Sequence, residues 1–124
     1  MLDITRAYVT TRRQFGVPVG SFQAVKHHLA NAKLALEFAA PAVLAAGVAL
    51  ATSTDTRRRD VSMAAILASE AAQATAKAAI QCHGAIGYTV EYDLHLYLKR
   101  TWALARSWGD AAWHRDRVAL SLGV

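Results

Sequence analysis

The chain has 124 residues, 54% of them hydrophobic, with only two prolines and seven glycines. This length provides one domain with a single modest core, and an alanine-rich composition with few helix breakers favours long packed helices over a β-sandwich or barrel. The net charge of +5 indicates an anionic partner, but the basic residues form no single stripe of the kind that binds nucleic acid.

Targeting and redox signals are sparse. No uncharged apolar stretch reaches the roughly 18 residues that span a bilayer, and the nearest, 38–52, contains a proline and a glycine. The amino terminus lacks the basic-then-apolar layout of an export signal. The single cysteine, Cys82, excludes an internal disulfide and offers no metal-ligand spacing. We therefore expect a cytoplasmic protein with no membrane segment and no bound metal.

The first half of the chain predicts two helices. Residues 1–14 are typical of the end of a helix, which Gly16 and the turn at 17–20 stop. Ser21 is a candidate cap for a long helix over 21–51, which continues through Pro41 with a local kink. Its apolar residues recur in steps of three and four, as in a coiled-coil seam. The seam consists of Phe22, Val25, Leu29, Ala32, Leu36, Ala39, Val43, Ala46 and Leu50.

The second half predicts three more helices. Three arginines at 57–59 would oppose a helix dipole, so we place them before an alanine-rich helix over 60–83. Glycines break the chain after it, and a fourth amphipathic helix covers 91–106. A last short helix covers 111–121. The predicted fold is all-α: an antiparallel up-down four-helix bundle with a short extra C-terminal helix.

Two polar motifs stand at predicted helix ends. After the alanine-rich helix, Gly84 exposes backbone amides that a phosphate can approach, and Gln81 stands just before them as a directional hydrogen-bonding group. Near the amino terminus, Arg12 carries a planar fork that suits phosphate oxygens. Each residue also has a plain structural interpretation, because glycine commonly ends helices and helix-end arginines are often only solvated.

Four separated motifs resemble the C-terminal helical domain of acyl-CoA dehydrogenases. They are Arg12-x-Gln14-Phe15-Gly16, Phe22-Gln23-Ala24-Val25, Gln81-x-x-Gly84-x-x-Gly87-Tyr88-Thr89-x-Glu91 and Leu96-Tyr97-x-x-Arg100. Their order, spacing and intervening helix lengths match over essentially the whole chain. The resemblance implies FAD as cofactor, oxidation of the Cα–Cβ bond of acyl-CoA thioesters as the reaction, and a homo- or hetero-oligomer held through the bundle.

The resemblance also implies roles for single residues. Arg12 matches an arginine that reaches the FAD pyrophosphate across a subunit interface, and Gln81 begins a second pyrophosphate clamp. The family commonly has a Gly-Gly pair there, so Ala85 requires a negative φ or a slightly more distant ligand. Among the adenosine-side matches, a role as packing anchor fits Phe15 at least as well, and for Phe22, which begins the apolar seam, we favour packing. The cofactor-binding candidates are Arg12, Gln14, Phe15, Phe22, Gln23, Gln81, Gly84 and Ala85.

No catalytic residue is predicted. Removal of the α-proton needs a carboxylate, which many family members place in the turn after the fourth helix. Trp108 or Gly109 occupies that position here, and neither accepts a proton. Asp110 is close, but its shorter arm and shifted position favour a role as cap of the last helix.

The missing base leaves two interpretations of the chain. The residues 1–124 form a single domain that lacks the N-terminal helical and β-barrel domains of a complete family member, so we expect the isolated chain to be inactive. It is then either a fragment, or a base-less partner subunit as in actinobacterial enzymes for bulky sterol-derived acyl-CoAs. An alternative from another class is a structural or interaction bundle that binds no flavin. A basic helical protein that binds nucleic acid is a further alternative.

Overall fold

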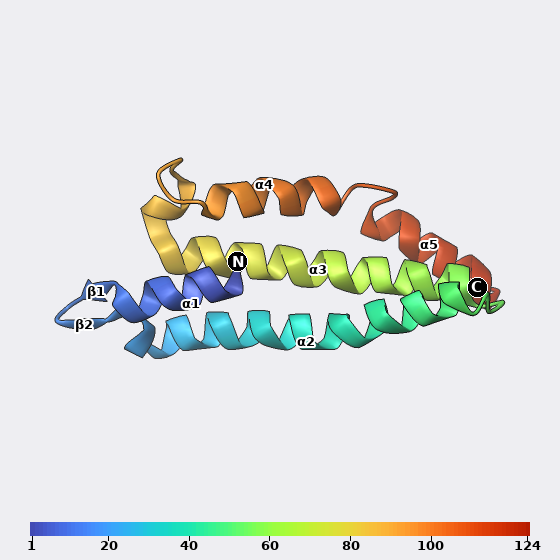
Figure 1. The fold of residues 1–124 in the computed structure, drawn as a ribbon, viewed down its shortest axis with the longest axis horizontal. Coiled ribbons are helices and arrows are strands. Elements are labelled where there is room, and N and C mark those ends of the chain that lie inside the picture. Colours follow the sequence, from blue (N-terminus) through green and yellow to red (C-terminus); the bar gives the residue numbers. More distant parts are fainter.

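The computed structural model describes all 124 residues. Its five α-helices are α1 (Leu2–Thr11), α2 (Gln23–Ala51), α3 (Arg57–His83), α4 (Leu94–Leu104) and α5 (Ala111–Leu122). Consecutive helices from α1 to α4 run antiparallel, with α3 between α2 and α4, while α5 packs on the first half of α3 (Figure 1). The predicted all-α bundle with a short extra C-terminal helix is confirmed.

A small hairpin follows α1, which ends at Thr11 and not at the predicted residue 14. Strand β1 (Arg13–Gln14) pairs antiparallel with β2 (Val17–Pro18). Phe15 and Gly16 connect them with φ values of 55° and 80°, as a two-residue type I′ turn requires. A short 3-10 helix, η1 (Val19–Ser21), comes next, so the predicted cap at Ser21 is wrong. Phe22 holds the N-cap position of α2 and makes no capping hydrogen bond with its side chain.

Helix α2 runs unbroken through Pro41 and curves toward α3 in its second half (Figure 1). The predicted seam is confirmed only in part. Ala32, Ala39 and Ala46, seven residues apart, are buried against α3, whereas Val43 and Leu50 are 47% and 55% exposed. Small residues let two helix axes approach closely, so the larger seam side chains lie at the edges of the contact.

Helix α3 begins at Arg57, so the prediction that the three arginines precede it is wrong. Local contacts offset their unfavourable position at the positive end of the helix dipole. The Arg57 guanidinium donates to the carbonyls of Ser53 and Thr54, at 3.2 and 2.8 Å. Arg59 pairs with Asp60, whose carboxylate also accepts a 2.7 Å hydrogen bond from Thr56.

The last third of the chain follows the prediction with shorter elements. A 3-10 helix, η2 (Gly84–Tyr88), follows α3, and α4 covers 94–104 instead of 91–106. On α4 the side chains of Leu94, Leu98 and Thr101 are buried, whereas Trp102 is 44% exposed. Asp110 caps α5 by accepting a 2.9 Å hydrogen bond from the Trp113 amide, which confirms its predicted role.

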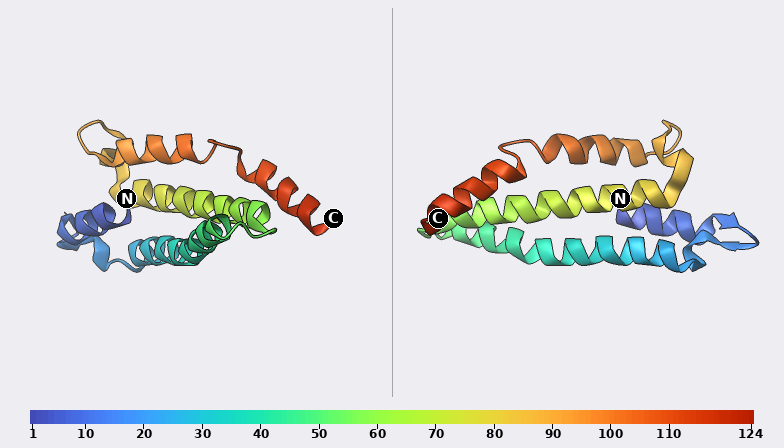
Figure 2. Two further views of the ribbon diagram at one scale, coloured as in Figure 1. Left: turned by 45° about the vertical axis from the view of Figure 1, so that its right-hand side comes forward. Right: turned by 180° about the vertical axis from the view of Figure 1, so that it is seen from behind.

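The core is small for this elongated molecule (Figure 2). Only 20 of the 124 residues are buried, and most of the apolar ones are alanines. Large apolar side chains remain outside, including all three tryptophans. We call one set of them the α2 apolar face: Leu34, Phe38, Leu44 and Val48, which are 56–72% exposed. By length and composition alone, α2 is also apolar enough to cross a membrane, a test that core helices of soluble proteins also pass.

Candidate functional site

The structure brings both predicted polar motifs to one end of the bundle, because α1 and α3 both end there (Figure 1). All eight candidate residues are exposed. Five of them belong to the hairpin and the start of α2: Arg12, Gln14, Phe15, Phe22 and Gln23. The other three, Gln81, Gly84 and Ala85, belong to the end of α3 and the first turn of η2.

The hairpin group combines a free cation with an aromatic pair. Arg12 holds the C-cap position of α1 through its backbone amide, and its guanidinium has no hydrogen bond or ion pair within the chain. Its neighbour Arg13 donates to the Gly16 carbonyl at 3.0 Å and so closes the hairpin. Phe15 is 84% exposed and packs edge-to-face against Phe22, with 6.3 Å between ring centroids. The aromatic pair can therefore contact a planar ring while the Arg12 guanidinium binds an anion beside it.

The α3 group is an open glycine turn. Gly84 has a φ of 64°, and a Cβ placed on it would meet no atom within 4 Å, so a ligand has room to approach its backbone. Ala85 is not among the residues with positive φ, which satisfies the condition that the sequence set for its methyl group. The turn therefore keeps its open backbone despite the alanine.

Gln81 faces a cavity of about 380 Å³ between α2 and α3. His28, Asn31 and Lys77 line the same cavity, and sequence reasoning missed all three. A signal for Lys77 was present, since it stands four residues before Gln81 on the same helix face. The two residues of α2 could be found only from the packing of α2 on α3. A cation and two further polar side chains thus accompany Gln81.

Below the glycine turn, His83 and Tyr8 tie the two motifs together. The rings of His83 and Tyr8 stack with centroids 4.4 Å apart, and the Tyr8 hydroxyl donates to the His83 carbonyl at 3.4 Å. The His83 Nδ1 atom donates to the Ala79 carbonyl at 2.8 Å. Since Arg12 follows Tyr8 by one helical turn, these contacts fix the end of α1 against the end of α3.

Burial decides the protonation of the two side chains that precede the glycine turn. It lowers the pKa of His83, although the hydrogen bond to the Ala79 carbonyl opposes the shift. Burial also raises the pKa of the Cys82 thiol. Near pH 7 the imidazole is therefore neutral and the cysteine is a thiol, which is the less nucleophilic form. Both serve as packing groups and not as reactive ones.

The two groups share an end of the molecule but not a cavity. Gln81 alone of the eight candidates lines one of the principal cavities. Neither Arg12 nor Gln81 is engaged by another side chain of the chain. The arrangement suits an extended anion lying across an exposed surface, which a second molecule must cover to exclude water.

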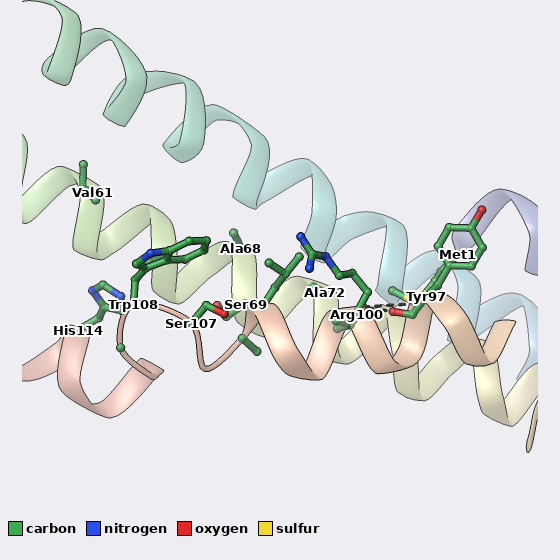
Figure 3. A pocket seen from close by; sticks show the side chains of 15 residues that line it. Met1, Val61, Ala68, Ser69, Ala72, Tyr97, Arg100, Ser107, Trp108 and His114 are labelled. Carbon is green, nitrogen blue, oxygen red and sulfur yellow. Dashed lines mark hydrogen bonds between the residues drawn. The ribbon is translucent and has the colours of Figure 1, made fainter.

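A larger cavity of about 620 Å³ lies between α3, α4 and the turn that precedes α5 (Figure 3). Trp108, which is 85% exposed with a φ of 60°, stands at one end of it and Met1 at the other. Its ionisable lining groups are Arg100, Tyr97 and His114, and no carboxylate lines it. The cavity offers apolar contact but no carboxylate base.

The turn itself leaves no space for a base. A Cβ on Gly109, whose φ is 109°, would collide with the ring of Trp113. The Asp110 carboxylate is engaged as the cap of α5. That the chain carries no catalytic residue remains a prediction.

The fold is an all-α bundle with the eight candidate residues exposed at one end. Comparison with known proteins identifies the family of this bundle. The sequence profile described as "Acyl-CoA dehydrogenase, C-terminal domain" matches residues 1–123, and the chain belongs to the acyl-CoA dehydrogenase family.

Relatives and solved structures agree with this assignment. The chain is 42% identical over 122 residues to acyl-CoA dehydrogenase FadE34 of Mycobacterium tuberculosis, a match covering 97% of this chain and 17% of that protein. It superposes on one chain of the ChsE4-ChsE5 complex of the same species with a TM-score of 0.91 and 29% identity, over 98% of this chain and 33% of that chain. For the FAD complex of PigA the TM-score is 0.90 and the identity 28%, over 98% and 32%. The chain thus spans a third or less of the length of these proteins.

Proposed function

We propose that this chain is the C-terminal domain or a partner subunit of an FAD-dependent acyl-CoA dehydrogenase, and that it contributes FAD pyrophosphate contacts and the oligomer interface. The observation that carries the proposal is the pairing, at one end of the bundle, of the unpartnered Arg12 guanidinium with the open glycine turn at Gly84. In an acyl-CoA dehydrogenase fold, such an end suits the phosphates of a dinucleotide.

The residues present fit FAD in three respects. Arg12 supplies charge-assisted hydrogen bonds for phosphate oxygens, and the left-handed Gly84 leaves its backbone open to them. The edge-to-face pair of Phe15 and Phe22 offers an aromatic surface for the adenine, with Gln14 and Gln23 beside it. When bound, FAD supplies the acceptor for hydride in dehydrogenation.

The remaining parts of the site come from outside residues 1–124. We propose that another polypeptide region holds the isoalloxazine and supplies the base, because the turn at 107–110 has only a capping carboxylate. The acyl-CoA substrate then binds in the assembled enzyme. One of the similar structures is a complex of two named proteins, which supports a mixed assembly as the form of this one. We place the assembly in the cytoplasm and away from membranes and nucleic acid.

We propose the α2 apolar face as the oligomer interface. Phe38 and Leu44 are 70% and 72% exposed, and between α2 and α3 an apolar groove of about 380 Å³ continues the surface. Exposed apolar surface of this extent on a soluble domain marks a contact with another molecule. A second copy or a related partner bundle is the natural occupant, since its own α2 offers the same face.

Flavin retention tests the proposal. The chain is co-purified with the region or partner that completes the enzyme, and absorbance near about 450 nm reports bound FAD. We expect the double variant Arg12→Ala, Gln81→Ala to lose flavin, since each lost charge-assisted hydrogen bond weakens binding by roughly tenfold or more. The matched control is Arg106→Ala, an exposed arginine in the turn just beyond the end of α4.

The alternative of a structural bundle predicts a different result. If the assembled protein carries no flavin, or if the double variant retains it as well as the parent does, Arg12 and Gln81 do not hold a pyrophosphate. The bundle would then serve assembly alone, through the α2 apolar face.

A further inference from the structure

His83, Tyr8 and Tyr92 form a three-ring cluster at the end of α3, where α1 ends beside it (Figure 1). The imidazole stacks on Tyr8 of α1 at an interplanar angle of 22°, and the Tyr92 ring stands 4.8 Å away, centroid to centroid. Gly87 closes the site from η2, since a Cβ there would come within 3.1 Å of the His83 Cβ. Three parts of the chain therefore enclose His83, which is 5% exposed.

We infer that His83 is a positioning residue whose neutral ring holds the end of α1 against the end of α3, and that a proton gained in mild acid releases this hold. Its place in the chain couples the ring to both polar motifs. Gly84 follows it directly, and Arg12 follows its stacking partner Tyr8 by one helical turn. The release does not depend on flavin, whereas its effect on flavin binding rests on the proposed function.

One nitrogen of the His83 ring has a partner and the other has none. Nδ1 donates to the Ala79 carbonyl at 2.8 Å, which leaves Nε2 without a proton in the neutral ring. Nε2 is buried and makes no hydrogen bond. A proton on Nε2 would create a buried cation with an N–H group that has no acceptor. The tyrosine faces attract a cation and offset part of this cost, but they supply no oxygen for the N–H group.

No charged side chain is placed to stabilise a protonated His83. The titratable groups that face the ring are Tyr8 from α1 and Tyr92 from the segment before α4, while Tyr88 of η2 is 74% exposed. Burial lowers the pKa of His83, and no charge on another side chain contributes to the shift. The ring also makes no ion pair or hydrogen bond with the ionisable side chains close to the cluster along the chain, which are Arg6, Arg12, Lys77, Cys82, Glu91, Asp93 and His95.

Backbone contacts around Tyr8 transmit a release of the ring to Arg12. The Tyr8 hydroxyl donates to the His83 carbonyl at 3.4 Å, and the Arg12 amide donates to the Tyr8 carbonyl at 2.8 Å. The Arg12 carbonyl in turn accepts from the Val19 amide at 2.8 Å, which ties the hairpin to the end of α1. Arg12 and the hairpin therefore move relative to Gly84 when the stack opens.

The proton balance sets the direction and size of the effect. A released ring has the ordinary pKa of about 6.5, and the pKa of the held ring lies below it. The hold is therefore complete above that value and weakens as the pH falls from there toward the pKa of the held ring. Because release takes up one proton, the equilibrium between held and released forms changes by up to about tenfold per pH unit in this range.

The 124-residue chain tests the release without flavin. Nuclear magnetic resonance spectra are recorded through the range in which histidine titrates, from about pH 8 to pH 5. We expect the His83 ring signals and the amide signals of Arg12 and the hairpin at 13–18 to change together, with a midpoint below about pH 6.5. Circular dichroism over the same range should show that the helix content persists.

Variants assign the effect to the proton on His83. His83→Phe keeps a ring in the cluster but takes up no proton, so the Arg12 signals should not change with pH. The matched control His27→Gln, at an exposed position of α2, should behave as the parent does. Tyr8→Ala removes the stacking partner and tests the hold even if His83→Phe does not fold. Its Arg12 signals should be independent of pH and close to those of the parent in acid.

Flavin retention in the assembled enzyme separates the inference from the proposed function. If Arg12 holds the pyrophosphate, the Kd for FAD should rise by up to about tenfold per pH unit below about pH 6.5 in the parent but not in His83→Phe. Arg12 signals that titrate in the chain while flavin retention is independent of pH would support the release and contradict the flavin role of Arg12. Arg12 signals that stay constant across the range, or that change equally in His83→Phe, would overturn the inference.

Discussion

Asp110 is the residue whose role is most sharply defined by its contacts. Its carboxylate accepts the Trp113 amide at 2.9 Å and makes the only side-chain N-cap among the five helices. We expect Asp110→Ala to lower the free energy of unfolding by about 0.5–2 kcal/mol, because an orphan amide loses its acceptor. Thermal or urea unfolding measures this.

The conservative change separates capping from charge. Asp110→Asn keeps an oxygen that accepts the same hydrogen bond, so its stability should stay close to that of the parent. If asparagine is as harmful as alanine, the carboxylate acts through its charge and the capping role is wrong.

His83 makes stability depend on pH. Its folded pKa lies below the unfolded value because burial penalises the charged ring, so the unfolded chain binds the proton more readily. The contribution of the neutral ring is fully present above the unfolded pKa of about 6.5. We expect stability to fall as the pH drops from 7 through that value toward the folded pKa, as urea unfolding at each pH would record. Burial also lowers the pKa of His114, so this residue contributes to the same loss of stability at acidic pH.

A matched pair of variants isolates the His83 contribution. His83→Gln should be less stable than the parent at pH 7 but should show a shallower decline toward acid. His27→Gln, at an exposed position of α2, should retain the decline of the parent. If stability declines equally steeply in His83→Gln, groups other than His83 cause the loss of stability at acidic pH.

Among the secondary-structure elements, the long helices were predictable and the hairpin was not. Apolar residues at helical spacing and a run of alanines define α2 and α3 without reference to neighbours. The β1–β2 hairpin has only two residues per strand and a phenylalanine at positive φ, which no local preference favours. The start of α3 was misplaced because the dipole argument ignored the Arg57 contacts with the connection between α2 and α3.

The α2 apolar face carries a prediction at the scale of the element. We expect Phe38→Asp combined with Leu44→Asp to dissociate the assembly, because each fully buried apolar side chain is worth about 1.5–3 kcal/mol. Both side chains are mostly exposed within the chain, so the helix content should persist. Sedimentation measures the dissociation of the assembly, and circular dichroism measures the helix content.

An aspartate placed on α2 outside the α2 apolar face tests whether any added charge on this helix dissociates the assembly. Ala24→Asp lies in the first turn of α2, where an acidic residue favours the helix dipole. It should leave the assembly intact. Dissociation by Ala24→Asp, or an intact assembly in the double variant, would place the interface on another surface.

At the scale of the whole molecule, the sequence predicted the motif residues at the polar end of the bundle but not the residues packed around them. Arg12 and Gln81 were found because their residue types and the glycines beside them form readable motifs. His28, Asn31 and the Tyr8–His83 stack depend on helices packing across long stretches of chain, and no spacing along one helix predicts them.

The exposed apolar surface makes the stability of the chain a property of its assembly. With 20 of 124 residues buried and much of that core made of alanine, a separate bundle has little apolar burial to offset its conformational entropy. In the proposed assembly, association would bury the α2 apolar face and stabilise the folded form by mass action. We therefore expect the Tm of the chain to rise by about 2–5 °C or more over a hundredfold increase in concentration. Scanning calorimetry at two protein concentrations measures the Tm, and sedimentation reports the oligomeric state of the same samples. A Tm independent of concentration in a monomeric sample would show that the bundle is stable without association.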